Sequence, residues 1–306
     1  MCNYNYEKFL SEIKNLDCVV SKNESMKKHT TIKIGGNADI FLNVNTENAL
    51  INIIKILNEE KIPFYILGNG SNLLVGDKGI SGVVIKLDGD FKKINTTIKQ
   101  QVVCGAGASI TRLCLYAYMN SLTGLEFLYG IPGTIGGAVY MNAGAYNGEI
   151  KDVLVNCTHI TRSGKKETLQ NEDLDFSYRH SFYSDKDYII TQATFKLASK
   201  EKTSIQKTME DLMQRRKSKQ PLNYPNAGSI FKRPTNNFAG ALIEKSGLKG
   251  KMIGDAKISE KHCGFIINKN HASCKDVLNL MEFVKEEVYK KTGVMLESEV
   301  KVLGEN

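Results

Sequence analysis

Two glycine-rich stretches, residues 66–75 and 130–145, constrain this chain more than any other feature. Both are flanked by apolar runs typical of strands, and both are rich in Gly, Asn, Ser and Thr. Glycine lacks the Cβ that would block an anion, and it reaches dihedral angles that turn successive N–H groups toward a ligand. One such stretch alone would favour a tight turn. Two of them could grip both ends of a diphosphate, so the sequence predicts a bound nucleotide cofactor.

The common nucleotide motifs do not account for these stretches. A Rossmann fingerprint needs glycine at the sixth position of G-x-G-x-x-G, and the pattern that begins at Gly68 has Leu73 there. No P-loop of the form G-x-x-x-x-G-K-[ST] occurs in the chain. Residues 105–107 are predicted to end a strand and to open a helix near Ser109. The predicted site is therefore neither a Rossmann nor a P-loop site.

Composition narrows the class of protein. A chain of 306 residues has room for two or three domains, and 42% apolar with 24% charged residues is typical of globular proteins. No apolar run approaches the length of a membrane span, and the N-terminus lacks the layout of a signal peptide, so we expect no membrane insertion. The net charge of +8 is spread along the chain. Its densest cluster, residues 215–219, is short and comes with no nucleic-acid-binding signature, so we expect no nucleic-acid partner.

The cysteines and histidines show no framework for metal or disulfide chemistry. Seven cysteines are scattered and never spaced C-x-x-C, which fits a reducing cytoplasm. Five histidines show no metal-ligand spacing, so no metal is predicted. Cys263 follows His262, but nothing indicates an activated thiolate, and a buried strand position is favoured.

Periodicity predicts an α+β fold with a boundary near residue 199. Before it we expect a short helix over 6–13, helices over 45–57 and 109–120, a hairpin turn at 162–165, and strands over 63–67, 82–87, 101–104, 153–160 and 188–197. Beyond it we expect helices over 201–217, 238–246 and 273–291, and strands over 229–232, 264–268 and 294–303.

Three places outside the glycine stretches could carry chemistry: Tyr178-Arg179, Ser229 and Glu299. Spacing alone favours a structural or surface role for each of them over a catalytic role. Arg179 could be an ordinary ion-pair residue and Ser229 a turn serine without a G-x-S-x-G elbow. Strand alternation in 294–303 would let Glu299 face solvent.

Taken in order, these motifs resemble the UDP-N-acetylenolpyruvoylglucosamine reductase family, the flavoenzymes of peptidoglycan precursor synthesis. Only the first two dozen residues fall outside the resemblance, and the chain resembles the shorter type, which lacks an insertion after the Tyr-Arg pair. The matching segments are residues 29–36, 67–74, 130–145, 178–179, 226–234 and 296–304.

The resemblance implies an FAD-binding fold of the vanillyl-alcohol-oxidase (PCMH) type over 30–198. An N-terminal helical segment (1–29) precedes it, and a substrate-binding α+β domain (199–306) follows. It also implies non-covalent FAD, NADPH as hydride donor, and reduction of UDP-N-acetyl-3-O-(1-carboxyvinyl)glucosamine to UDP-N-acetylmuramate. A cytoplasmic monomer is the expected form, although the sequence does not fix the oligomeric state.

The resemblance also assigns residues. Ser229 is expected to donate the proton, while Arg179 and Glu299 stabilise the charge that develops beside the substrate carboxylate. Substrate binding falls on Tyr178, Lys217 and Arg233. The expected FAD contacts are Gly68, Asn69, Gly70, Ser71, Asn72, Pro132, Gly133, Thr134, Gly136, Gly137, Asn142 and Gly144.

Two other functions compete with this one. A different flavin oxidase or dehydrogenase could use the same cofactor scaffold, because a fold does not fix chemistry. The motifs around Ser229 and Glu299 argue against it. The second is a non-catalytic nucleotide-binding module with residues 215–219 as its partner site, which a chromophore bleached by NADPH would exclude.

Overall fold

The computed structural model describes residues 4–98 and 100–306, and the chain forms two compact units. The first comprises Met1–Lys22, Ile40–Gly68 and Gly82–Gln214, and the second comprises Asn23–Asp39, Asn69–Ser81 and Arg215–Asn306. Each unit has its own hydrophobic core. The predicted domain boundaries at 29/30 and 198/199, which separate the N-terminal segment, the FAD-binding domain and the substrate-binding domain, stay a prediction.

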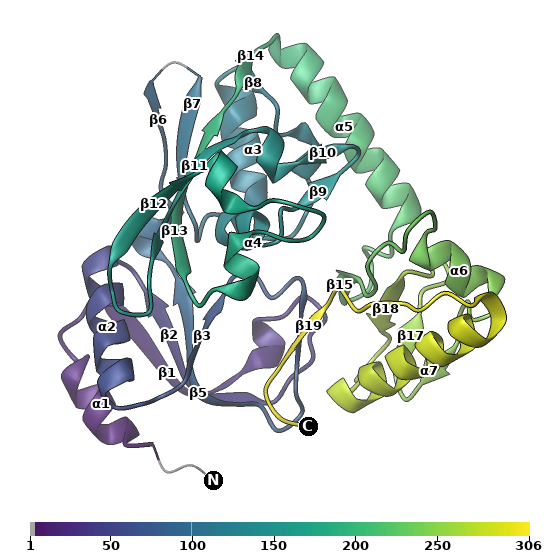
Figure 1. Cartoon of the computed structure of the whole chain (residues 1–306), viewed down its shortest axis with the longest axis horizontal. Coiled ribbons are helices and arrows are strands. Elements are labelled where there is room, and N and C mark those ends of the chain that lie inside the picture. Colours follow the sequence, from purple (N-terminus) through teal and green to yellow (C-terminus); the bar gives the residue numbers. More distant parts are fainter. Residues whose placement is uncertain (1–3, 99) are drawn as a thin grey trace. The chain divides into compact units, whose positions relative to one another are not determined.

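The first unit contains two larger sheets (Figure 1). One sheet has four strands, and most of their residues lie in this unit. Its strand order is β1 (Cys18–Ser25), β2 (Asn37–Val44), β5 (Ile80–Leu87) and β3 (Phe64–Leu67). The other is antiparallel, in the order β12 (Lys166–Gln170), β11 (Leu154–Ile160), β13 (Ile189–Lys196), β7 (Gln101–Gly105) and β6 (Ile94–Ile98). The helices are α1 (Tyr6–Glu12), α2 (Glu47–Glu59), α3 (Ile110–Met119) and α4 (Ile135–Tyr140).

The remaining elements of the first unit are short. Two-residue strands pair as β8 (Leu122–Thr123) with β14 (Ala198–Ser199) and as β9 (Gly144–Ala145) with β10 (Gly148–Glu149). Along the chain, 3-10 turns cover Met26–Lys28, Gly89–Lys92, Glu126–Leu128, Ile150–Asp152, Asn171–Leu174 and Phe182–Asp185. The long helix α5 (Lys202–Lys219) contains the bond at which the two units divide.

Several predicted features of the first unit are confirmed. Thr46 caps α2 and Ser109 caps α3, while β7 ends at Gly105. The turn at 162–165 is present, with Gly164 at φ +84° and its N–H bonded to the Thr161 carbonyl. The strand after that turn is β12, which sequence reasoning missed. Its alternate residues are exposed and its composition is polar, so no apolar run marks it.

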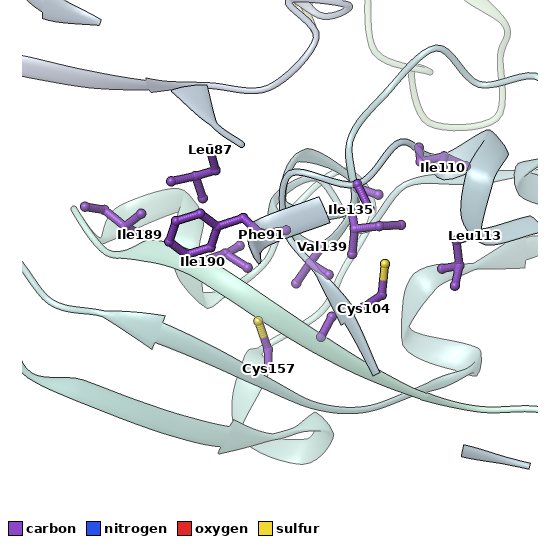
Figure 2. Packing of buried hydrophobic residues seen from close by; sticks show 14 of the residues in the cluster. Leu87, Phe91, Cys104, Ile110, Leu113, Ile135, Val139, Cys157, Ile189 and Ile190 are labelled. Carbon is purple, nitrogen blue, oxygen red and sulfur yellow. The ribbon is translucent and has the colours of Figure 1, made fainter. Parts of the chain in front are cut away.

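The core of the first unit fixes the helix inside the second glycine stretch. Figure 2 shows Ile135 and Val139 of α4 in the same cluster as Cys104 of β7 and Cys157 of β11. Helix α4 packs against β13 and β7. Burial raises the pKa of the Cys104 and Cys157 thiols to about 12, so both stay protonated near neutral pH. The apolar residues of α4 thus anchor residues 130–145 to the sheet.

The second unit has a four-stranded antiparallel sheet and two helices. The strand order is β15 (Asn226–Ser229), β18 (Phe265–Asn268), β17 (Ala256–Ile258) and β16 (Met252–Ile253). The helices are α6 (Ala239–Lys245) and α7 (Cys274–Thr292), and α7 packs against β16 and β17. In addition, β4 (Leu73–Val75) pairs in parallel with β19 (Lys301–Leu303), which joins the last residues of the first glycine stretch to the C-terminal strand.

Two predicted strands of this unit are wrong in extent. The strand expected at 229–232 instead covers Asn226–Ser229, and its register shifts between these residues, where Gly228 has φ +75°. The strand expected at 294–303 covers only Lys301–Leu303. Ahead of β19 the backbone N–H of Glu299 turns to the Ile230 carbonyl, 2.7 Å away, so regular alternation does not apply. Glu299 is consequently half-buried rather than directed to solvent.

Among the helices of the described residues, none is both long and apolar enough to cross a bilayer.

The N-terminus of α7 gives a test of the fold. Ser273 accepts from the Asp276 N–H, and the Asp276 carboxylate accepts from the Ser273 N–H. Because Ser273→Ala removes this cap, we expect the free energy of unfolding to fall by about 1 kcal/mol. Urea denaturation measures it. Ser218→Ala, in the last turn of α5, is the matched control with no cap to lose, and equal shifts in both variants would contradict the capping role.

Candidate functional site

In the first unit the two glycine stretches meet. Gly68 stands directly after β3, and a Cβ built on it would lie 2.6 Å from Thr134 Oγ1. Thr134 is the N-cap of α4, where its Oγ1 accepts from the Gly137 N–H at 3.4 Å. Only glycine at position 68 leaves room for this threonine. The meeting of the stretches therefore depends on a missing side chain.

Two neighbouring glycines of the second stretch have different roles. Gly136 donates its N–H to the Ala106 carbonyl at 2.9 Å, and a Cβ on it would come within 3.1 Å of the Ala106 Cβ. Its small size serves the packing of α4 on the chain beside β7. A Cβ on Gly137 would meet only Thr134 Oγ1, at 3.5 Å, within the described residues. Gly137 therefore leaves space that the protein itself does not fill, as a ligand-lining glycine would.

The other assigned residues of this stretch are held by protein contacts. The Gly133 carbonyl accepts from the Ile110 N–H at 3.0 Å, and Pro132 precedes it. A Cβ on Gly144 would lie 2.7 Å from the Gly148 carbonyl oxygen, so glycine is needed there for the β9–β10 pairing. Asn142 is fully buried and uses its amide within the protein.

Tyr178 and Arg179 occupy the tip of a tight turn. Ser177 and His180 exchange both backbone hydrogen bonds at 3.2 Å, which leaves these two residues between them. Arg179 has φ +57°, a left-handed conformation that residues other than glycine rarely adopt. Its Nη2 donates to the Gly144 carbonyl at 3.1 Å, and its guanidinium carbon lies 4.8 Å from the centroid of the Tyr178 ring. The arginine is thus fixed against the end of the second glycine stretch.

In the second unit the first glycine stretch lies against two distant segments. Gly70 has φ +58°, and a Cβ on it would lie 2.2 Å from the His29 carbonyl oxygen. Thr31 donates its N–H to the Gly70 carbonyl at 3.3 Å and its hydroxyl to the Asn226 carbonyl at 2.7 Å. Thr31 therefore connects this stretch to the segment that carries Ser229. Sequence reasoning assigned it no role, although it lies in the matching segment 29–36.

Ser229 and Glu299 come together through Ile230, the residue that follows Ser229 and the end of β15. The Ile230 carbonyl accepts from the Glu299 N–H at 2.7 Å. The Asn72 side chain donates to the Glu299 carbonyl at 3.2 Å, and the Asn72 carbonyl accepts from the Lys301 N–H at 3.0 Å. Both Ser229 and Glu299 are half-buried. The predicted proton donor, the predicted acid and a predicted FAD contact are thus neighbours in this unit.

Lys217 lies at a basic cavity of about 530 Å³ in the second unit. The ammonium group of Lys261 donates to the Lys217 carbonyl at 2.5 Å. Glu260, a carboxylate in the lining, forms an ion pair with Lys257, and the hydrogen bond from Lys257 lowers the pKa of Glu260. The cavity thus keeps an excess of positive charge suited to an anion. Its lining residues are Lys217, Pro221, Leu222, Asn223, Tyr224, Lys257, Ser259, Glu260, Lys261, Ile267 and Lys269.

Arg233 is not part of that lining. Its side chain is exposed, and its guanidinium carbon lies 4.6 Å from the centroid of the Phe238 ring.

Burial lowers the pKa of His262 and raises that of Cys263, so the pair favours a neutral imidazole and a protonated thiol over a reactive thiolate. Among residues 4–98 and 100–306, no three His, Cys, Asp or Glu side chains are placed to hold a metal ion.

Comparison with known proteins identifies the family. Residues 38–170 match the FAD binding domain family, and residues 220–303 match the C-terminal domain of UDP-N-acetylenolpyruvoylglucosamine reductase. These matches confirm the predicted α+β fold with an FAD-binding portion and a C-terminal domain. The crystal structure of UDP-N-acetylenolpyruvylglucosamine reductase from Thermus caldophilus superposes with a TM-score of 0.80 at 37% identity, covering 94% of this chain and 98% of that one.

Relatives of known family match the sequence of this chain along nearly its whole length. The UDP-N-acetylenolpyruvoylglucosamine reductase of Clostridium novyi is 48% identical, covering 95% of this chain and 96% of its own. That of Caldanaerobacter subterraneus is 50% identical, with 92% of this chain and 93% of the relative covered. On this identity and coverage, together with the two domain matches, the chain belongs to the UDP-N-acetylenolpyruvoylglucosamine reductase family.

Proposed function

We propose that this protein is the flavin-dependent oxidoreductase that reduces UDP-N-acetyl-3-O-(1-carboxyvinyl)glucosamine to UDP-N-acetylmuramate in peptidoglycan synthesis, with NADPH as hydride donor. Membership of the reductase family and the FAD-binding domain support the reaction. The observation that carries the assignment of residues is the grouping of Ser229 and Glu299 around the Ile230 carbonyl, beside Asn72. A cytoplasmic, monomeric enzyme is part of the proposal.

The open space at Gly137 and the contact between Gly68 and Thr134 fit a non-covalent FAD. Bound there, FAD would supply the hydride-transfer chemistry between NADPH and the substrate. The residues that would hold it in the first unit are Gly68, Pro132, Gly133, Thr134, Gly136, Gly137 and Gly144. Those in the second unit are Asn69, Gly70, Ser71 and Asn72.

The roles of the three catalytic residues follow from charge. Addition of hydride to the vinyl carbon leaves negative charge on the carbon beside the substrate carboxylate, and groups that stabilise this charge act mainly in the transition state. Arg179 would supply a permanent charge with planar donors that match a carboxylate. A protonated Glu299 would assist. Ser229 would give the proton that completes the reduction.

Binding of the sugar nucleotide is assigned to Tyr178, Lys217 and Arg233. Lys217 has the strongest support, because its cavity is lined by four lysines and has the excess positive charge that a diphosphate requires. The exposed Tyr178 ring stands beside Arg179 in the turn, where it could contact the substrate near its carboxylate.

The two half-reactions test the function and the role of Ser229 together. The purified protein should carry FAD that NADPH bleaches and that the enolpyruvyl sugar nucleotide reoxidises. Ser229→Ala should leave bleaching nearly intact and slow reoxidation on the order of 10²-fold, because only the second half-reaction needs the proton. Stopped-flow absorbance of the flavin measures both rates. Equal slowing of the two would refute the role of Ser229, and a protein that takes up no FAD would refute the function.

The FAD contact at Gly137 has its own test. Gly137→Ala adds a methyl group that the protein can accommodate, and alanine also favours the helix. We expect unchanged or higher stability of the FAD-free protein and FAD affinity weakened about tenfold, because the methyl group would press on the cofactor. Fluorescence titration with FAD measures the affinity. Gly68→Ala, whose Cβ meets Thr134 within the protein, should instead lower stability even without FAD. Unaltered FAD binding by Gly137→Ala would show that Gly137 does not contact the cofactor.

Lys217 is tested by substrate kinetics. Lys217→Ala should raise KM for the sugar nucleotide about tenfold, with kcat little changed, because it removes one charge-assisted contact to the diphosphate, which does not react. Lys290→Ala, an exposed lysine of α7, is the matched control and should change neither constant. A fall in kcat at constant KM would argue against a role in binding.

A further inference from the structure

The turn that carries Arg179 is tied to the segment directly after α4. The side-chain amide of Asn142 donates to the Ser177 carbonyl at 3.0 Å, and Arg179 Nη2 donates to the Gly144 carbonyl at 3.1 Å. One bond holds the base of the turn and the other holds the guanidinium itself. All four residues belong to the first unit.

The amide of Asn142 has no donor left for a ligand. Its Nδ2 donates to the Ser177 carbonyl and to Glu149 Oε2, the latter at 3.1 Å. Its Oδ1 accepts from the Lys151 N–H at 3.1 Å. The residue is 0% exposed. An NH₂ group has two hydrogens, and both are committed to protein acceptors. A fully satisfied buried amide of this kind fixes the parts it joins.

The backbone around Arg179 needs such support. Arg179 at φ +57° and Asn142 at φ +40° are both left-handed. Asparagine tolerates this conformation, whereas arginine keeps it only where its surroundings impose it. The two bonds between Ser177 and His180 close the turn, and the bond from Asn142 to the Ser177 carbonyl sets its direction.

We propose that Asn142 is a positioning residue for Arg179, which acts through the Ser177 carbonyl, and that its side chain is not an FAD ligand. The proposal rests on the proposed function, in which Arg179 meets the substrate carboxylate. Removal of the amide frees the base of the turn and lets the guanidinium drift from the direction that the developing charge requires. A small displacement of a group that acts in the transition state slows the reaction greatly while binding changes little.

Asn142→Gly is the first variant, because glycine keeps the left-handed backbone while all three side-chain bonds are lost. We expect the dissociation constant of FAD, measured by fluorescence, and flavin reduction by NADPH to stay nearly unchanged. Reoxidation by the enolpyruvyl sugar nucleotide should slow about 10- to 100-fold. Thr158→Val is the matched control. It removes another buried polar contact of this unit, the 2.9 Å bond to Thr168 Oγ1, and should leave reoxidation unaltered.

A double-mutant cycle separates positioning from a general loss of structure. In an Arg179→Ala background, Asn142→Gly should slow reoxidation no further, because its effect passes through the missing guanidinium. Additive slowing would overturn the proposal. Asn142→Asp provides a second variant of the same size, which also tolerates the left-handed backbone, should the glycine variant not fold. It loses both donors and faces the Glu149 carboxylate, so it should reproduce the defect.

Failure of this inference differs from failure of the proposed function. Loss of FAD affinity in Asn142→Gly or Asn142→Asp, with wild-type turnover normal, would make Asn142 a cofactor ligand and overturn the positioning role. Normal reoxidation in both variants would overturn it as well. A wild-type protein that binds no FAD or does not reduce the enolpyruvyl substrate would refute the function itself, whatever the Asn142 variants do.

Discussion

Close approach of backbone to its neighbours is the constraint on which both units depend. In the first unit Thr134 occupies the space where a side chain at position 68 would be, and in the second unit the His29 carbonyl does the same at Gly70. Neither approach is possible with a Cβ present. These positions set where the glycine stretches run, and the hydrophobic cores then fix the elements around them, as α4 shows with Ile135 and Val139.

Much of the fold was predictable because its signals are local. The helix starts near Thr46, Ser109 and Ser273 and the turn at 162–165 were each predicted from the sequence, because each depends on residues within one turn of chain. The polar strand β12 was not, because its exposed alternate residues leave no apolar pattern. The final strand was overestimated, because the backbone of Glu299 pairs with a residue far away in sequence, which periodicity does not reveal.

The candidate site shows the same division. Motif resemblance assigned Arg179, Ser229 and Glu299, whereas spacing alone favoured plain structural roles for all three. The contacts that position them were not predictable, since Thr31 reaches Asn226 and Asn142 reaches Ser177 across long separations in sequence. Which glycines of the second stretch serve packing and which leave space for a ligand was not predictable either. Gly136 serves packing against Ala106, whereas its neighbour Gly137 leaves open space.

The bond between the Ile230 carbonyl and the Glu299 N–H has an evolutionary consequence. Both partners are peptide groups, which every amino acid supplies, apart from the donor that proline lacks. Codon changes at either position can therefore alter the side chains without deleting the link, unless position 299 becomes proline. The main-chain connection between the serine segment and the glutamate therefore does not depend on which side chains surround it.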